Sequence, residues 1–177
     1  WAHKNHRLIV DALACLRKAG SDDVYAVFCG SDCGNLPAVL EMAKQKGLDD
    51  LVKYVGFVPD EQMSAFYKQS LALVMPSYFG PTNMPPFEAF ALDTPVIVSD
   101  LPGIRDQVGD AAMLISPDKP DELGKAIALL AKDEKIRKSL VAKGRKRLSD
   151  FSDKDRLTTL RDIFNSYDRK RLCWSIE

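Results

Sequence analysis

The chain has 177 residues, of which 46% are hydrophobic and 28% charged, a composition that can bury one substantial core. Its 25 Lys and Arg residues balance its 25 Asp and Glu residues, which excludes a general basic field that would attract nucleic acid or anionic membrane. Neither a secretory signal nor an apolar run of membrane length is present. We therefore expect one domain over residues 1–177, with any anion site confined to a few residues.

The first half of the chain alternates apolar runs of helical and strand periodicity. In order, the pattern predicts a helix over residues 5–19, a strand over 24–29, a helix over 35–46, a strand over 51–55 and a helix over 60–69. Asn5 and Asp60 are the expected caps of the first and third of these helices.

The second half continues the alternation and then changes to helices alone. The expected elements are a strand over residues 71–75, a helix over 85–92, a strand over 95–99, a short helix within 102–108, a strand over 112–115, and helices over 121–132, 133–148 and 153–171. Strands that alternate with helices indicate an α/β fold, a Rossmann-like parallel sheet with helices on both faces. In such sheets ligands bind beyond the carboxyl ends of the strands, so the loops after residues 29, 55, 75 and 98 should share one crevice.

The segment 76–100, PSYFGPTNMPPFEAFALDTPVIVSD, is the most informative of these junctions. A buried strand leads into an irregular loop, and Pro85 and Pro86 then suit the opening of a helix. Free amides and the helix dipole would favour a phosphate group there, and Glu88 could accept hydrogen bonds from a sugar or ribose hydroxyl. The simpler alternative is an ordinary helix start with Glu88 complementing the dipole.

The four cysteines, Cys15, Cys29, Cys33 and Cys173, have no paired metal-type spacing, which predicts a reduced, cytosolic chain. The alternative for Cys29 and Cys33 is a redox or ligand pair. His3 and His6 lack partners for a metal site, so we expect no metal. A GxGxxG fingerprint, a Walker A motif and a GxSxG elbow are all missing, which argues against nicotinamide enzymes, P-loop enzymes and serine hydrolases.

Three segments together resemble the glycosyltransferases of GT-B architecture, in particular the retaining family 4, also called group 1. The segment HKNHRLIVDAL is similar to the one that opens the family's C-terminal domain. VKYVGFVPDEQMSAFYKQS is similar to VxFxGxVxDxExxxxYxxA, and DTPVIVSDLPGIRDQVGDAAMLISP to GxPVIxSxxGGxxExxGDAAxLxxP. The resemblance implies the donor-binding C-terminal half of a two-domain enzyme, and the start at Trp1 suggests a piece excised from a longer protein.

The resemblance also implies roles for single residues. Lys4 matches the basic residue that neutralises the donor diphosphate, and Glu88 matches the second Glu of the family's acidic motif, which binds the ribose. Gly80 stands where the first Glu is expected, so the carboxylate that would touch the donor sugar is missing. Gly30, in the loop after the first predicted strand, is expected at the donor site from its place at a strand end. The resemblance further implies that Val58 lies against the nucleobase and that the amides of Thr82, Asn83 and Met84 face the phosphates. It also implies that the side chains of Thr82 and Asn83 form neutral hydrogen bonds in place of the missing carboxylate.

The activity implied is transfer of a sugar, with retention, from a nucleoside diphosphate sugar to a hydroxyl of a saccharide or lipid-linked acceptor. It needs no metal or other cofactor, because Lys4 and backbone amides stabilise the departing diphosphate. The acceptor site is expected in an N-terminal domain of the same protein, so the chain alone should be inactive. A cytoplasmic place is implied, or a peripheral one at the inner membrane for the longer protein. The alternatives are a degenerate nucleotide-binding or scaffolding module and a sugar-nucleotide epimerase of similar architecture.

Overall fold

The computed structural model describes residues 1–21, 23–80, 83–151 and 153–174, and side chains of the last helix for 157–168 only. A short 3-10 helix, η1 (Ala2–Lys4), precedes the first α-helix. The α-helices are α1 (His6–Lys18), α2 (Leu36–Gln45), α3 (Asp60–Gln69), α4 (Pro85–Ala91), α5 (Ile104–Val108), α6 (Pro120–Lys132), α7 (Glu134–Ser149) and α8 (Asp153–Trp174). The strands are β1 (Ala26–Cys29), β2 (Val52–Gly56), β3 (Leu73–Met75), β4 (Val96–Ser99) and β5 (Met113–Ile115).

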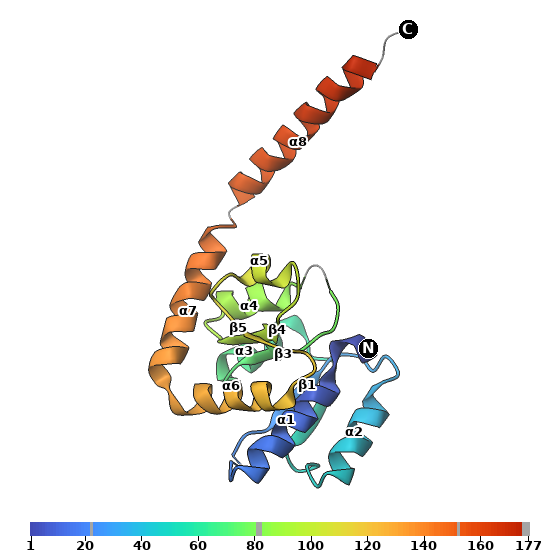
Figure 1. The fold of residues 1–177 in the computed structure, drawn as a ribbon, viewed down its shortest axis with the longest axis vertical. Coiled ribbons are helices and arrows are strands. Elements are labelled where there is room, and N and C mark those ends of the chain that lie inside the picture. The colour runs from blue at the N-terminus through green and yellow to red at the C-terminus, as the bar shows by residue number, and fades with distance from the viewer. Residues whose placement is uncertain (22, 81–82, 152, 175–177) are drawn as a thin grey trace.

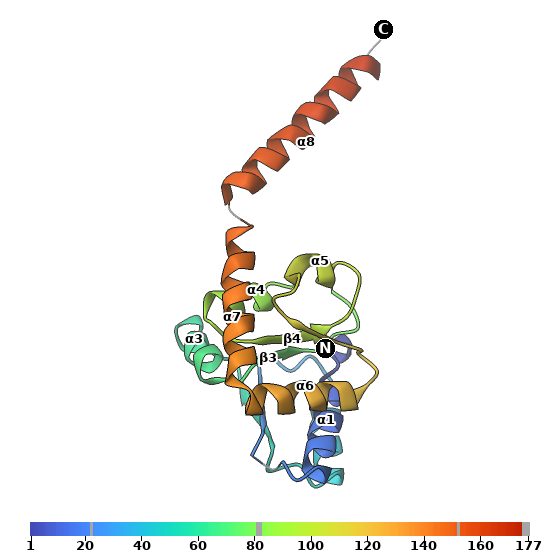
Figure 2. The same cartoon turned by 60° about the vertical axis from the view of Figure 1, so that its left-hand side comes forward.

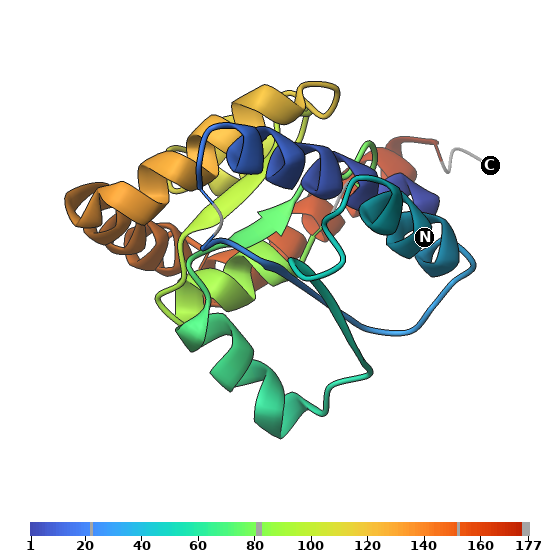
Figure 3. The ribbon, with the colours of Figure 1, turned by 90° about the horizontal axis from the view of Figure 1, so that it is seen from below.

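All strand pairings are parallel, which confirms the expected Rossmann-like fold class. The strands form two hydrogen-bonded groups: β1 pairs with β2, and β4 lies between β3 and β5. Register puts Leu73 opposite Val96, and Ile97 opposite Met113. Helices lie on both sides of these strands, with α1 and α6 on one side and α3 and α4 on the other (Figure 3).

Strand β4 is buried on both faces because its side chains alternate between two cores. Ile97 belongs to the larger core, which α1 and α6 close, whereas Val96 and Val98 belong to the smaller core beneath α4 and α5. Strands β1 and β2 differ, since Val27 and Val55 are exposed while Phe28 and Val52 are buried. Cover on both faces is therefore complete for β4 and incomplete for β1 and β2.

The two expected helix caps do not form. Asn5 lies at the cap position of α1 but makes no capping hydrogen bond, and Asp60 is the first residue of α3, after Pro59 at the cap position. Helix α7 is capped by a side chain, because Asp133 accepts hydrogen bonds from the amides of Lys135 and Ile136. Sequence alone predicted where these helices begin and could not show where the Asn5 side chain points.

Helix α7 packs closely on α4 through Gly144. A Cβ atom there would lie 2.7 Å from Cδ1 of Phe90, so only glycine permits this approach. Beside it, Arg145 forms a two-point ion pair with Asp93, with distances of 2.6 and 2.5 Å. Asp93 has a left-handed φ of 59°, a conformation that few residues other than glycine, Asn and Asp adopt.

Helix α8 extends away from the rest of the molecule (Figures 1 and 2). Its described side chains include five exposed apolar ones: Leu157, Leu160, Ile163, Phe164 and Tyr167. Among the described residues, no helix is long and apolar enough to cross a membrane.

Candidate functional site

The predicted site lies where the parallel strands end, and its first part is the junction of β1 and β2. The amide of Gly30 donates to the carbonyl of Gly56 over 2.8 Å, and the Tyr54 hydroxyl donates to the carbonyl of Gly30 over 2.7 Å. Gly30 has a φ of 112°, which a residue with a side chain rarely adopts. Val58, two residues beyond β2, is buried.

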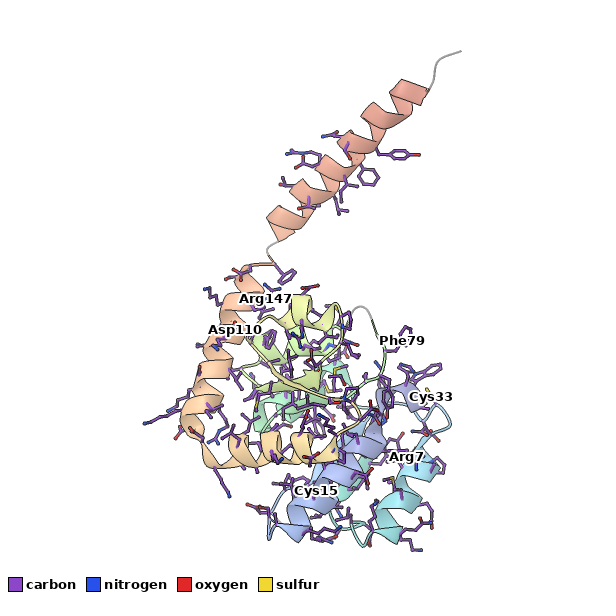
Figure 4. All side chains as sticks on the ribbon, in the orientation of Figure 1. Arg7, Cys15, Cys33, Phe79, Asp110 and Arg147 are labelled. Atoms are coloured by element: carbon purple, nitrogen blue, oxygen red, sulfur yellow. The ribbon has the colours of Figure 1, made fainter. Side chains whose placement is uncertain are left out.

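The N-terminal segment lies against the same edge. The amide of Tyr78, in the loop after β3, donates to the carbonyl of His3 over 2.9 Å. The His3 ring contacts Phe79 edge-on, with ring centres 5.7 Å apart, and Phe79 itself is largely exposed (Figure 4). Lys4, half-buried, follows His3, and no carboxylate among the described residues forms an ion pair with it.

Asn5 holds the N-terminal segment against the ends of the strands. Its side chain is only 5% exposed, and its Nδ2 donates to the carbonyls of Pro76, over 3.0 Å, and Pro117, over 2.8 Å. Pro76 follows β3 and Pro117 lies just beyond β5. Asn5 adopts a left-handed φ of 56°.

The loop between β3 and α4 is closed by Asn83. This side chain is 8% exposed, and its Nδ2 donates to the carbonyl of Gly80 over 3.2 Å. Gln107 of α5 donates to the carbonyl of Asn83. Gly80 has a φ of 146°, and a Cβ there would lie 3.1 Å from Oδ1 of Asn83. The loop is therefore shaped for glycine at position 80. Pro81 and Thr82, the latter a predicted donor-binding residue, lie outside the described residues.

The start of α4 offers fewer amides than the sequence suggested. Pro85 and Pro86 have no N–H group, and the amides of Phe87 and Glu88 both donate to the carbonyl of Met84, over 2.9 and 3.1 Å. The free amides in this stretch belong instead to Asn83 and Met84, which have no acceptor among the described residues. An anion here would be bound by the loop before the helix, which corrects the expectation of a helix-terminus site.

Glu88 is exposed and has a partner that the sequence did not reveal. The Tyr67 hydroxyl, from α3, donates to Oε2 of Glu88 over 2.8 Å. Burial and the nearby carboxylate of Glu88 raise the pKa of Tyr67 well above its usual range, so the hydroxyl remains a donor at all ordinary pH values. Thr94 holds the end of α3 in place by donating to the carbonyl of Tyr67 over 2.9 Å.

Two shallow depressions lie at the opposite end of the strands and include none of the predicted residues. One is lined by residues that precede β1, β3 and β4 and by the first turns of α7. Four of its charged residues form ion pairs, Arg145 with Asp93 and Lys138 with Glu134.

Residues 2–147 match the family described as Glycosyl transferases group 1. The chain belongs to this family. The group 1 relatives include the O-antigen chain mannosyltransferase RfbU of Salmonella typhimurium, 30% identical over 67% of this chain and 32% of that protein. Another is the D-inositol 3-phosphate glycosyltransferase of Corynebacterium kroppenstedtii, 25% identical over 94% of this chain and 39% of that protein. The chain thus spans well under half the length of these curated relatives.

Solved structures share the fold of this group 1 chain. The sucrose-phosphate synthase of Thermosynechococcus elongatus has a TM-score of 0.81 at 22% identity, over 96% of this chain and 44% of that one. The Anabaena protein HepE in complex with UDP-glucose has a TM-score of 0.80 at 18% identity, over 94% and 46%. A C-terminal domain of a group 1 protein from Francisella tularensis, LpcC, has a TM-score of 0.72 at 21% identity, over 85% and 80%.

Proposed function

We propose that the chain is the donor-binding domain of a glycosyltransferase and that it binds a nucleoside diphosphate sugar at the carboxyl ends of its strands. The observation that carries this is Lys4, a half-buried cation of the group 1 chain that has no carboxylate partner among the described residues and lies on the edge where such folds bind ligands. A diphosphate is the chemical group that such a cation and nearby free amides recognise.

The donor would lie across this edge with its diphosphate near Lys4 and the amides of Asn83 and Met84. Glu88 would accept from the ribose hydroxyls, since Tyr67 occupies only one of its two carboxylate oxygens. Val58 would lie against the nucleobase. Gly30, which has no side chain, would let the donor approach the backbone closely. Thr82 is the further loop residue that we assign to the donor by resemblance. HepE, a protein of similar fold, is described in complex with UDP and with UDP-glucose, which supports a nucleotide sugar as the ligand class.

Chemically, the bond between the anomeric carbon and the diphosphate oxygen breaks, and the electron pair leaves with the diphosphate. The acceptor oxygen forms the new bond to the anomeric carbon with retention, and its hydroxyl proton goes to the departing diphosphate. Negative charge grows on the leaving oxygen, so a fixed cation and amide dipoles lower the barrier without a metal. A single domain provides one wall of the site, and we expect residues 1–177 alone to bind donor without turnover. A two-domain protein that adds an acceptor-binding N-terminal half would transfer the sugar.

The loop at Gly80 favours a second candidate, a nucleotide-binding module that has lost transferase activity. The first Glu of the acidic motif is replaced, and the φ of Gly80 and its contact with Asn83 oppose any side chain there. Neutral groups of the loop would have to contact the sugar in place of a carboxylate.

Calorimetry on residues 1–177 tests the proposal. We expect nucleoside diphosphates to bind more tightly than the matching monophosphates, and unphosphorylated nucleosides to bind least, at fixed modest salt. Equal affinity for diphosphate and nucleoside would remove the anion site. Mass spectrometry of mixtures with nucleotide sugars and acceptors would separate the two candidates, because the longer protein should form glycosides only if it is a transferase.

A further inference from the structure

Asn5 makes an unusual set of contacts for a residue at the start of a helix. Its backbone is left-handed, its side chain is almost fully buried, and it makes no capping hydrogen bond. Instead, the one nitrogen Nδ2 bridges the carbonyls of Pro76 and Pro117, which lie beyond β3 and β5 on either side of the central strand β4. The requirements of α1 do not explain these contacts.

From this geometry we infer that Asn5 is a positioning residue for Lys4, an inference that rests on the proposed function. Asn5 is anchored to the strand ends on one side of Lys4, and His3 on the other side accepts from the amide of Tyr78 over 2.9 Å. The backbone of Lys4 is therefore fixed to the sheet before and after the residue. A long, flexible lysine on a fixed backbone keeps its charge within reach of one place on the strand edge.

The chemistry of the bridge restricts which side chain can form it. To reach both carbonyl acceptors, one short side chain must carry two N–H donors, which an amide nitrogen provides and a hydroxyl or carboxylate does not. The left-handed backbone further favours Asn or Gly over other residues. Asn meets both demands. Asp would instead direct carboxylate oxygens at two carbonyl oxygens, and Gly would keep the backbone conformation while losing the bridge.

The test is a double-mutant cycle between Asn5 and Lys4, read by calorimetry with a nucleoside diphosphate and with pyrophosphate. Asn5→Gly is the main variant because it tolerates the native φ, and Asn5→Asp is the second. In the protein with Lys4 we expect Asn5→Gly to weaken pyrophosphate binding about tenfold, a size typical of coupled neighbours. In the Lys4→Ala background, Asn5→Gly should cause almost no further loss of pyrophosphate binding. The binding of the unphosphorylated nucleoside should be the same in both backgrounds.

A matched control separates positioning from general loss of stability. Asp133→Ala removes the side-chain cap of α7 and should lower the midpoint of urea unfolding without weakening pyrophosphate binding. Urea unfolding of every variant shows that binding is measured on folded protein. Equal losses from Asn5→Gly with and without Lys4 would make Asn5 merely structural and overturn the inference. If Lys4→Ala itself had no effect on diphosphate binding, the proposed role of Lys4 would fail, and the inference with it.

Discussion

The two ends of the sheet use their charged residues differently. At the amino ends of the strands, Arg145 of α7 pairs with Asp93 at 2.5 Å, which joins α7 to the turn after α4, and Lys138 pairs with Glu134 of the same helix at 2.8 Å. At the carboxyl ends, Asp100 and Arg105 pair in a similar way, whereas Lys4 has no carboxylate partner in the described part of the chain and Glu88 has the neutral Tyr67. Lys4 is therefore a cation that remains available to an anionic ligand, and it lies at the end of the strands where such folds bind ligands.

The largest effect should come from Lys4→Ala, with Lys138→Ala as its matched control at the other end of the sheet. Loss of a charged contact to phosphate should weaken diphosphate binding by about 1.5 to 3 kcal/mol and reduce its dependence on salt. Lys138→Ala should leave binding unchanged, because that ammonium is already paired with Glu134. Calorimetry at two salt concentrations measures both. Equal losses in the two variants would mean that the contrast between the two ends has no bearing on binding.

Glu88→Gln should affect a different part of the donor. We expect ligands that contain ribose to lose about 1 to 3 kcal/mol of binding free energy, the scale of a hydrogen bond to a charged group, while pyrophosphate binds as before. The comparison of the two ligands by calorimetry measures this. A loss confined to pyrophosphate would place Glu88 on the phosphates and contradict the assignment.

Tyr67→Phe should have a smaller effect of the same kind. The change removes the donor that orients Glu88 over 2.8 Å and should weaken ribose-containing ligands by about 0.5 to 1.5 kcal/mol. Its effect should vanish in a Glu88→Gln background if Tyr67 acts through Glu88. Additive losses in the double variant would show that Tyr67 acts independently.

The smallest effect concerns pH. Burial lowers the pKa of His6, and the chain's amino terminus and Lys4 lower it further, so the fold favours the neutral ring. Above pH 6.5, the ordinary pKa of a histidine, His6 is neutral in the unfolded state as well, and its protonation costs the folded state no stability. As the pH falls below that value, the unfolded state takes up the proton first and stability declines until the folded pKa is passed. Urea unfolding at several pH values should show this decline, and His6→Gln should reduce it. An unchanged pH dependence in that variant would contradict the assignment to His6.

Much of the fold could be predicted from the sequence, because the spacing of apolar residues and the Gly, Pro and Asp residues that mark the ends of helices and strands are local signals. The bounds of α3 agree with the prediction, and most others differ by only one or two residues. Contacts between distant segments were not predicted. Nothing in the residues near Tyr67 indicates Glu88, 21 positions away, or links Asn5 to Pro117 across 112 positions. The number of free amides at the start of α4 was overestimated, because the two prolines that mark this helix start have no N–H group.

The most direct test of the central claim is to map pyrophosphate and nucleoside diphosphate onto isotope-labelled protein by NMR. We predict that the changes in amide chemical shift will concentrate on Lys4, Gly30, Asn83 and Met84 at the carboxyl ends of the strands. The shift changes of these residues should all saturate at the same ligand concentration. Saturable shifts confined to the paired charges around Asp93 and Arg145 at the amino ends would contradict the claim.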